Sequence, residues 1–299
     1  MPREAMHWYI AQQALDAYSS VPFVLERNAY FLGAMAPDAG YFYLEGRGDT
    51  AFPERLHGKD GEDTWDPLRL ALQRTKSDLH KSFLLGYMSH VITDAIFHPA
   101  VYYITGNYYD VDEAKRLTAV KNHRLLETKL DCWIRARYPQ TSLPRYVKDL
   151  WKSVDELTAV SALLACEIFT TEQLVASFQS FGSSQYKFLS PLIGAFVRVS
   201  TGVSERMRDL DSLFAFGRSS GLEQFDQPFS YRQPITGELF QTVTWHQLIE
   251  QAVAEHQQYF TKFFQSLLQG TIFCEGEVGP SLNFGLPSVS IEQARYFAS

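Results

Sequence analysis

Histidines and carboxylates recur at intervals of four in one apolar stretch of this sequence. The segment GYMSHVITDAIFHP, residues 86–99, contains His90, Asp94 and His98. On a helix, side chains four residues apart share one face, with Cβ atoms roughly 5 to 6 Å apart. His90 and Asp94 could therefore bind the same metal ion, and imidazole with carboxylate suits zinc.

His98 lies one further turn along the same expected helix. Eight helical residues rise about 12 Å, so His90 and His98 are not expected to reach one ion. This spacing predicts more than one metal, with Asp94 between the two histidines. Because Pro99 follows directly and disfavours the helical conformation before it, we expect His98 at a kink or end of the helix.

A second segment, NHRLLETKLD, repeats the four-residue spacing with His123, Glu127 and Asp131. We expect His123 and Glu127 to supply two metal ligands. Asp131 is expected to be either a carboxylate that supports a ligand or an exposed acid. Helical bundles build metal sites from inward side chains on facing helices. The two segments are therefore predicted to face each other across metal.

Three further candidate ligands lie in the first sixty residues. Asp38 follows a proline in PDAGYF, His57 lies in the loop RLHGKDGEDT, and His7 lies at the start of the first expected helix. Single histidines on helices are more often structural than metal-binding. The remaining histidines are expected to be surface or satisfied polar residues: His80, His246 and His256.

Apolar residues recur at helical spacing over most of the chain, and no long stretch alternates like a strand. The sequence predicts an all-α fold, with helices over residues 8–18, 23–35, 66–74, 79–104, 112–136, 143–165, 171–180, 185–216 and 244–269. Asp110 or Asp112 is expected to cap the helix near residue 112. Loops are expected over 35–64 and 217–238, and the second could form a small hairpin.

Four tyrosines follow the apolar stretch. They are interpreted as packing and loop aromatics, with a substrate platform as the alternative: Tyr102, Tyr103, Tyr108 and Tyr109.

The length of 299 residues allows one or two domains, and we predict one over 1–299. Its metal-site portion would cover about 1–135 and a helical portion about 140–270, followed by an irregular tail over 271–299. Three widely separated cysteines indicate neither a disulfide framework nor a thiolate zinc site. Any metal must therefore use histidine and carboxylate.

The formal net charge of −7 gives no reason to expect a stable nucleic-acid partner. It argues only mildly against a nuclease, because bound dications reverse the local sign at an active site. No apolar run reaches the roughly 18 residues of a transmembrane segment. No signal peptide is visible, so we expect a cytoplasmic protein, or a secreted one if the chain was trimmed.

Taken together, these residues resemble the zinc-dependent phospholipase C family, whose fold is shared with single-strand-specific zinc nucleases. The matching segments are MHWYIAQQAL, FLGAMAPDAGYF, the loop of His57, GYMSHVITDAIFHP and NHRLLETKLD, in family order over roughly the first 135 residues. The resemblance implies two or three zinc ions. One would be held by Asp38, His57, His90 and Asp94, another by His98, His123 and Glu127, and a third by His7, Asp94 and the free N-terminus.

The start of the chain departs from the secreted family enzymes, which begin after processing with a metal-chelating tryptophan. Here the sequence begins MPRE, and we expect removal of Met1 to leave the Pro2 amine as the substitute. Glu127 is typical of the phospholipase branch, because the nucleases more often have aspartate there.

The resemblance implies a zinc-dependent phosphodiesterase that cleaves a phospholipid to diacylglycerol and a phosphorylated head group, with at most transient contact with a membrane surface. Asp38 is the expected catalytic residue, which orients or deprotonates water. Two alternatives stay open. One is a single-strand nuclease or nucleotidase of the same fold, and the other is a non-catalytic metal-binding helical protein, because fold does not fix function.

Overall fold

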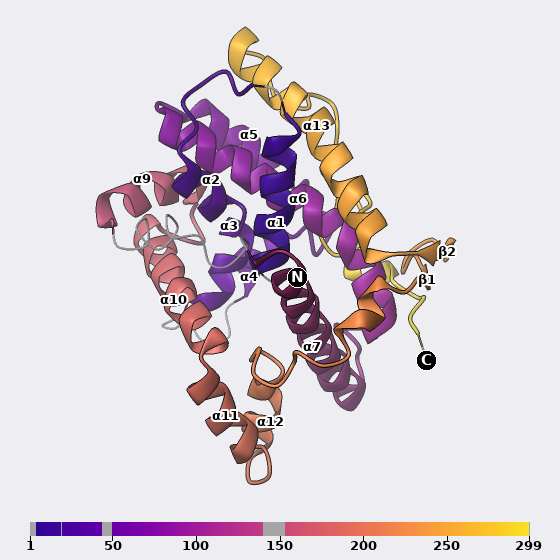
Figure 1. The fold of residues 1–299 in the computed structure, drawn as a ribbon. Coiled ribbons are helices and arrows are strands. Elements are labelled where there is room, and N and C mark those ends of the chain that lie inside the picture. The colour runs from indigo at the N-terminus through magenta and orange to yellow at the C-terminus, as the bar shows by residue number, and fades with distance from the viewer. Residues whose placement is uncertain (1–3, 19, 44–49, 140–152, 299) are drawn as a thin grey trace.

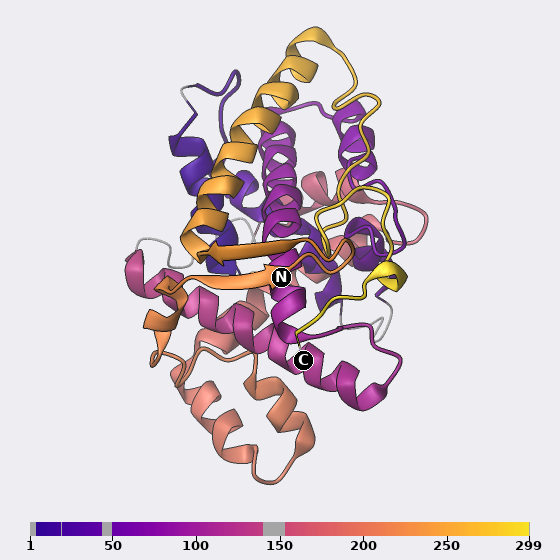
Figure 2. The same cartoon turned by 90° about the vertical axis from the view of Figure 1, so that its right-hand side faces the viewer.

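Helices make up nearly all the regular structure in the computed structural model, which describes residues 4–18, 20–43, 50–139 and 153–298. The all-α prediction is confirmed, with a single two-stranded hairpin among the described residues (Figures 1 and 2). The α-helices are α1 (Glu4–Asp16), α2 (Arg27–Gly33), α3 (Ala36–Ala39), α4 (Ala51–Leu56), α5 (Asp66–Gln73), α6 (Asp78–Thr105), α7 (Glu113–Arg137), α9 (Val154–Leu164), α10 (Thr171–Leu189), α11 (Pro191–Ser200), α12 (Glu205–Asp211) and α13 (Trp245–Gln269). Short 3-10 helices are η1 (Gly40–Phe42), η3 (Leu222–Asp226) and η4 (Ile291–Gln293), and the strands are β1 (Phe229–Arg232) and β2 (Leu239–Val243).

Helix α6 runs through the middle of the molecule and packs against α1, α2, α5, α7, α9 and α13 (Figure 1). Its apolar side chains are buried on every face, among them Phe83, Val91 and Phe97. A helix surrounded by other helices can be apolar all round. Its first turn is capped by Ser77, whose side chain accepts a hydrogen bond from the backbone N–H of His80.

Two glycines let α2 and α6 cross at close range. A Cβ atom on Gly33 would lie 1.9 Å from the carbonyl oxygen of Phe83, and one on Gly86 would lie 1.9 Å from that of Tyr30. Both positions thus admit only hydrogen. The close crossing sets the end of α2 against the part of α6 that carries the histidine motif.

The helix does not end at His98, because α6 continues through Pro99 to Thr105. Proline has no N–H, so the carbonyl of Ala95 loses its helical partner. Gly285 approaches this carbonyl so closely that a Cβ would lie 2.2 Å from the oxygen, and its φ of +70° also favours glycine. The C-terminal tail therefore packs directly on α6 beside the proline.

Several predicted boundaries differ from the structure. The continuous helix expected over 185–216 is divided into α10, α11 and α12, because Ser190 caps a new helix that starts at Pro191. The loop expected over 35–64 contains α3, η1 and α4. In the helix expected over 143–165, residues 143–152 lie outside the described residues, and α9 occupies Val154–Leu164.

The hairpin lies later than expected. Its strands cover Phe229–Arg232 and Leu239–Val243, so only β1 and the turn fall inside 217–238. The strands are antiparallel, with Tyr231 opposite Phe240 and Arg232 opposite Leu239. The rings of Tyr231 and Phe240 stack with their centres 4.8 Å apart. Both residues belong to the apolar cluster that also contains residues of α13.

Among the described residues, no helix combines the length and the apolar character that crossing a membrane requires.

Candidate metal centre

A first cluster joins four of the predicted ligands, Asp38, His57, His90 and Asp94, whose ligand atoms all lie within 4.8 Å of one another. His57 Nε2 is 3.1 Å from Asp38 Oδ1 and 3.8 Å from Asp94 Oδ2. His90 Nε2 is 3.5 Å from Asp38 Oδ1 and 3.1 Å from Asp94 Oδ2. All four side chains are buried. Two imidazoles and two carboxylates that converge on one point are a donor set that suits zinc.

Short local elements bring this cluster to α6. Asp38 lies in α3, a single helical turn that starts at Ala36 and has Pro37 in its first positions. His57 follows the last residue of α4, where its ring hydrogen-bonds to the carbonyl of Pro53. These two segments therefore present a carboxylate and an imidazole to the histidine motif on the central helix.

A second cluster joins His98 of α6 with His123 and Glu127 of α7. Glu127 Oε1 is 2.8 Å from His123 Nε2 and 3.7 Å from His98 Nε2. All three side chains are buried. Asp112 caps α7 by accepting hydrogen bonds from the N–H groups of Ala114 and Lys115, which decides between the two predicted caps.

Asp94 belongs to the first cluster and also contacts His98 of the second cluster and the eighth candidate, His7. Its Oδ1 is 3.2 Å from His7 Nε2, and its Oδ2 is 3.8 Å from His98 Nδ1. The rings of His7 and His90 stack at 4.2 Å. All eight predicted ligands are thus brought together around this carboxylate. The predicted contribution of Pro2 lies outside the described residues.

Backbone carbonyls fix the orientation of three rings. Nδ1 of His57, His90 and His98 lies 2.6, 2.9 and 2.5 Å from a carbonyl oxygen. A carbonyl only accepts, so each Nδ1 is the donor and each Nε2 faces the carboxylates with a lone pair or a second proton. Nε2 of His98 has no hydrogen-bond partner among the described residues, and the two oxygens of Asp94 face the imidazoles of His7, His57, His90 and His98. Buried polar atoms rarely stay unsatisfied, so this arrangement fits bound metal.

The pKa shifts of the buried histidines and of Asp94 also fit bound metal. Burial lowers the pKa of His98 and of His123 well below 6.5, so both rings are neutral at pH 7. Burial also acts to lower the pKa of His90, but Asp94 and Asp38 outweigh it and raise the value to about 9. Burial acts to raise the pKa of Asp94, but His98, His90 and His7 hold it well below 3.8. A dication would displace the proton of His90 and neutralise buried carboxylate charge.

Asp131 is buried and ties α7 to the start of α1, so the exposed alternative is wrong. Its Oδ2 accepts a hydrogen bond from the N–H of Ala5, and its Oδ1 accepts one from the N–H of Met6, both at 3.1 Å. His7 is the next residue along α1. The carboxylate therefore fixes the helix that carries His7 to the helix that carries His123 and Glu127.

The C-terminal tail contributes a contact that the sequence did not reveal. The carbonyl oxygen of Leu282 accepts the hydrogen bond from His98 Nδ1, and the N–H of Leu282 donates to the carbonyl of His57 at 2.9 Å. One backbone residue thus links both clusters. A backbone donor and acceptor carry no side-chain signature, so no sequence pattern could have identified this role.

Tyrosines surround the second cluster. The rings of Tyr102 and Tyr108 lie 5.0 and 5.3 Å from the ring of His123. Tyr102 is buried and donates a hydrogen bond to Asn283 Oδ1 at 2.8 Å, which fits the packing interpretation. Tyr108 and Tyr109 are only partly buried beside it.

Among the three remaining histidines, His256 is buried and both of its ring nitrogens have hydrogen-bond partners. Its Nδ1 lies 2.5 Å from the carbonyl of Ala252, and its Nε2 lies 2.8 Å from Ser89 Oγ. Burial lowers its pKa to about 4. His256 is therefore a neutral core residue next to the metal centre and has no place in either cluster.

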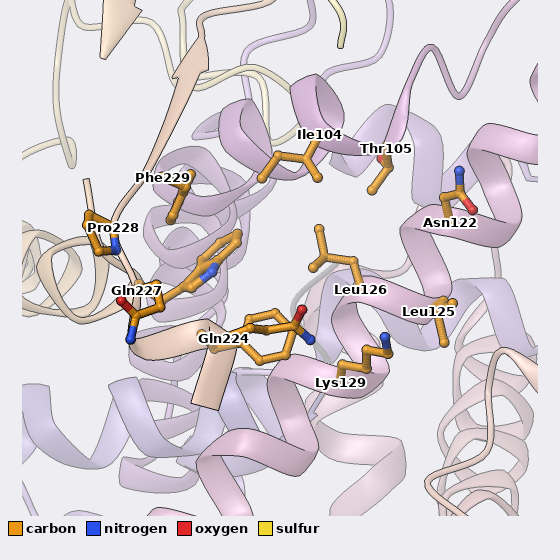
Figure 3. A pocket seen from close by; sticks show the side chains of 12 residues that line it. Ile104, Thr105, Asn122, Leu125, Leu126, Lys129, Gln224, Gln227, Pro228 and Phe229 are labelled. Carbon is orange, nitrogen blue, oxygen red and sulfur yellow. The ribbon is translucent and has the colours of Figure 1, made fainter. Parts of the chain in front are cut away.

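A separate cavity of about 380 Å³ lies on the other side of α7 (Figure 3). Its lining includes Leu126 and Lys129 of α7, Ile104 of α6 and Phe229 of β1. None of the eight candidate ligands lines it. Helix α7 therefore presents one face to the metal centre and another to this cavity.

Comparison with known families gives one match. Residues 6–168, more than half of the chain, match the family described as zinc dependent phospholipase C. Comparisons with curated proteins and with solved structures gave no match. The matched residues include all eight candidate ligands, from His7 to Glu127. The chain belongs to the zinc-dependent phospholipase C family, which consists of phosphodiester hydrolases.

Proposed function

We propose that this protein hydrolyses a phospholipid to diacylglycerol and a phosphorylated head group, using two or three zinc ions. The observation that carries the proposal is the pair of buried clusters that meet at Asp94, one with Asp38, His57 and His90 and the other with His98, His123 and Glu127. Membership of the family supports the substrate class.

Bound zinc supplies Lewis-acid chemistry, which polarises the phosphoryl oxygens and lowers the pKa of the attacking water. The protein's own groups then position and move the proton. Asp38 Oδ1 faces His57 and His90, so its second oxygen is the atom we assign to accept the proton from water. The carbonyls of Pro53, Ala34 and Leu282 hold the imidazoles in the orientation that this requires.

The test measures phosphocholine and diacylglycerol released from phosphatidylcholine, with nucleotide release from single-stranded DNA in parallel. We expect phosphocholine release by the zinc-loaded protein. Asp38→Asn should lower turnover by roughly 10²-fold or more, and Glu127→Ala should lose one zinc per molecule. The matched controls are Asp66→Asn and Glu113→Ala, whose side chains are exposed, and both should keep zinc and turnover.

Other results would reject the proposal. Faster release of nucleotides than of phosphocholine would identify a nuclease. A full zinc complement without cleavage of either substrate would identify a non-catalytic metal protein. Intact-mass measurement of the active protein tests the Pro2 amine, because retention of Met1 with three zinc ions bound would exclude it.

A further inference from the structure

An arm projects from the body of the molecule away from α13. It consists of residues 190–216, with α11, a turn and α12, and it extends beyond the end of α10 in both views (Figures 1 and 2). The inner face of α11 packs within the arm, because a Cβ on Gly194 would lie 2.4 Å from the Cβ of Phe216, and Val197 is buried. Arg198 Nε donates to Asp211 Oδ1 at 2.6 Å, which joins α11 to α12.

The outer face of the arm is apolar and exposed. Leu192, Phe196 and Val199 repeat at intervals of four and three on α11, which places them on one stripe, and Val203 follows in the turn after the helix. Their exposed fractions are 84%, 66%, 83% and 88%. Isolated exposed apolar residues are ordinary, but a contiguous stripe on a projecting helix marks an interaction surface.

The arm lacks the negative charge of the whole chain. Residues 190–216 contain three basic and three acidic residues, a net charge of zero, whereas the whole chain has −7. Arg206 and Arg208 of α12 are exposed, and Lys187 is exposed just before the arm. An exposed apolar stripe on a helix, with exposed basic side chains nearby, fits the interface of a lipid membrane.

The base of the arm contacts both sides of the metal centre. Thr128, next to Glu127 on α7, donates a hydrogen bond to the carbonyl of Ser212 at 2.7 Å. Phe188 contacts Phe214 of the arm at 5.4 Å and Phe42 at 6.5 Å, and Phe42 ends the segment that begins with α3. A surface that held the arm would therefore hold the metal centre beside it.

We propose that the outer face of the arm inserts into the interface of a lipid bilayer. The inference rests on the proposed function, because a phospholipid substrate lies in such a bilayer. A second copy of the chain fits less well. A stable dimer buries about 20–30 residues on each side, whereas the exposed apolar face of the arm has four residues.

The test is sedimentation of the zinc-loaded protein with vesicles of phosphatidylcholine. The triple variant Leu192→Ser, Phe196→Ser, Val199→Ser should bind at least about tenfold more weakly than wild type. The matched control replaces three apolar residues that are exposed outside the arm, Val24→Ser, Leu268→Ser and Ile272→Ser, and should bind as wild type does. Zinc content and thermal melting of both variants check the fold.

Three results would overturn the proposal. These are equal vesicle binding by wild type and the triple variant, no vesicle binding by wild type, or a wild-type dimer that the triple variant dissociates. Hydrolysis of a short-chain, monomeric phosphatidylcholine separates this inference from the proposed function. Unchanged hydrolysis with unchanged vesicle binding in the triple variant rejects only the arm. Arm-dependent binding without any lipid hydrolysis by wild type rejects only the proposed function.

Discussion

The role of Asp94 between two metal clusters could be predicted from the sequence. Its position four residues from His90 and from His98 predicted a carboxylate between two metals, and the structure brings His7 to it as well. Helical spacing is a local property, so the sequence displays it. The approach of Asp38 and His57 depends on tertiary packing, and only the resemblance to the family indicated that these residues join the motif.

Asp131 illustrates a residue whose role the spacing left open. It accepts two backbone N–H groups of α1, and we expect Asp131→Ala to release the start of that helix and with it His7. Loss of such a support typically weakens metal affinity by about 10- to 100-fold. We therefore predict weaker binding of the zinc held by His7, measured by zinc titration against a competing chelator.

The control for this change is Asp112→Ala. Asp112 also accepts two backbone N–H groups, at the exposed start of α7. Both variants should lose about 1 kcal/mol of unfolding free energy, as helix caps do. If both variants also weaken zinc binding equally, Asp131 has no specific role in the metal centre.

At the scale of elements, local signals predicted the long helices, and packing decided the rest. The continuous apolar pattern of α6 identified it as central, but Pro99 was expected to interrupt it. Helix α6 continues through the proline, and Gly285, nearly two hundred residues away in the sequence, packs against the carbonyl of Ala95 beside it. Single turns such as α3 are too short to show a period and were therefore expected to be loop.

The crossing of α2 and α6 gives a prediction about stability. Gly86→Ala would place a methyl group 1.9 Å from the carbonyl oxygen of Tyr30, which backbone atoms cannot avoid without separating the helices. We expect a loss of about 3 kcal/mol in the free energy of unfolding, measured by urea denaturation. The movement should also lengthen the hydrogen bond between His90 and Ala34, and so weaken zinc binding.

Gly202→Ala is the matched control, because a Cβ there meets nothing within 4 Å. Its stability should stay within about 1 kcal/mol of wild type. Equal stability of the Gly86→Ala and Gly202→Ala proteins would show that the crossing tolerates separation of the two helices.

At the scale of the whole molecule, burial of histidine makes stability depend on pH. Burial lowers the pKa of four histidines, which are His7, His98, His123 and His256. Burial also acts to lower the pKa of His90, but Asp94 and Asp38 outweigh it and raise that pKa to about 9. A lowered pKa means that the unfolded chain binds protons first as the pH falls below 6.5, so stability decreases there. In the metal-free protein His90 acts in the opposite direction, and its contribution to stability is lost as the pH rises through about 9.

His256 tests this linkage outside the metal ligands. Its pKa of about 4, against 6.5 in the unfolded chain, should remove about 3 kcal/mol of stability as the pH falls from 6.5 to 4. We predict that His256→Gln loses less stability than wild type over this interval, measured by urea denaturation at each pH. His246→Gln, which changes a partly exposed ring, is the control and should follow wild type. Equal pH profiles for wild type and His256→Gln would contradict the linkage.

The arrangement of the tail is the part of the molecule that the sequence predicted least. Residues 271–299 were expected to be irregular, and among those described only η4 and isolated bridges are regular. An irregular segment has no period from which its contacts could be inferred. Its position across α6 and beside both clusters depends on single contacts such as those of Gly285 and Leu282.

The contact of Leu282 with His98 has a consequence for when the protein can acquire its metal. The ribosome makes the chain from the N-terminus, so all eight candidate ligands emerge long before residue 282. Until then the ring of His98 lacks the acceptor that orients it, and His57 lacks the contact with the tail. The nascent chain therefore carries every candidate ligand before these two contacts can form, and we expect metal binding to be completed only after Leu282 has been synthesised.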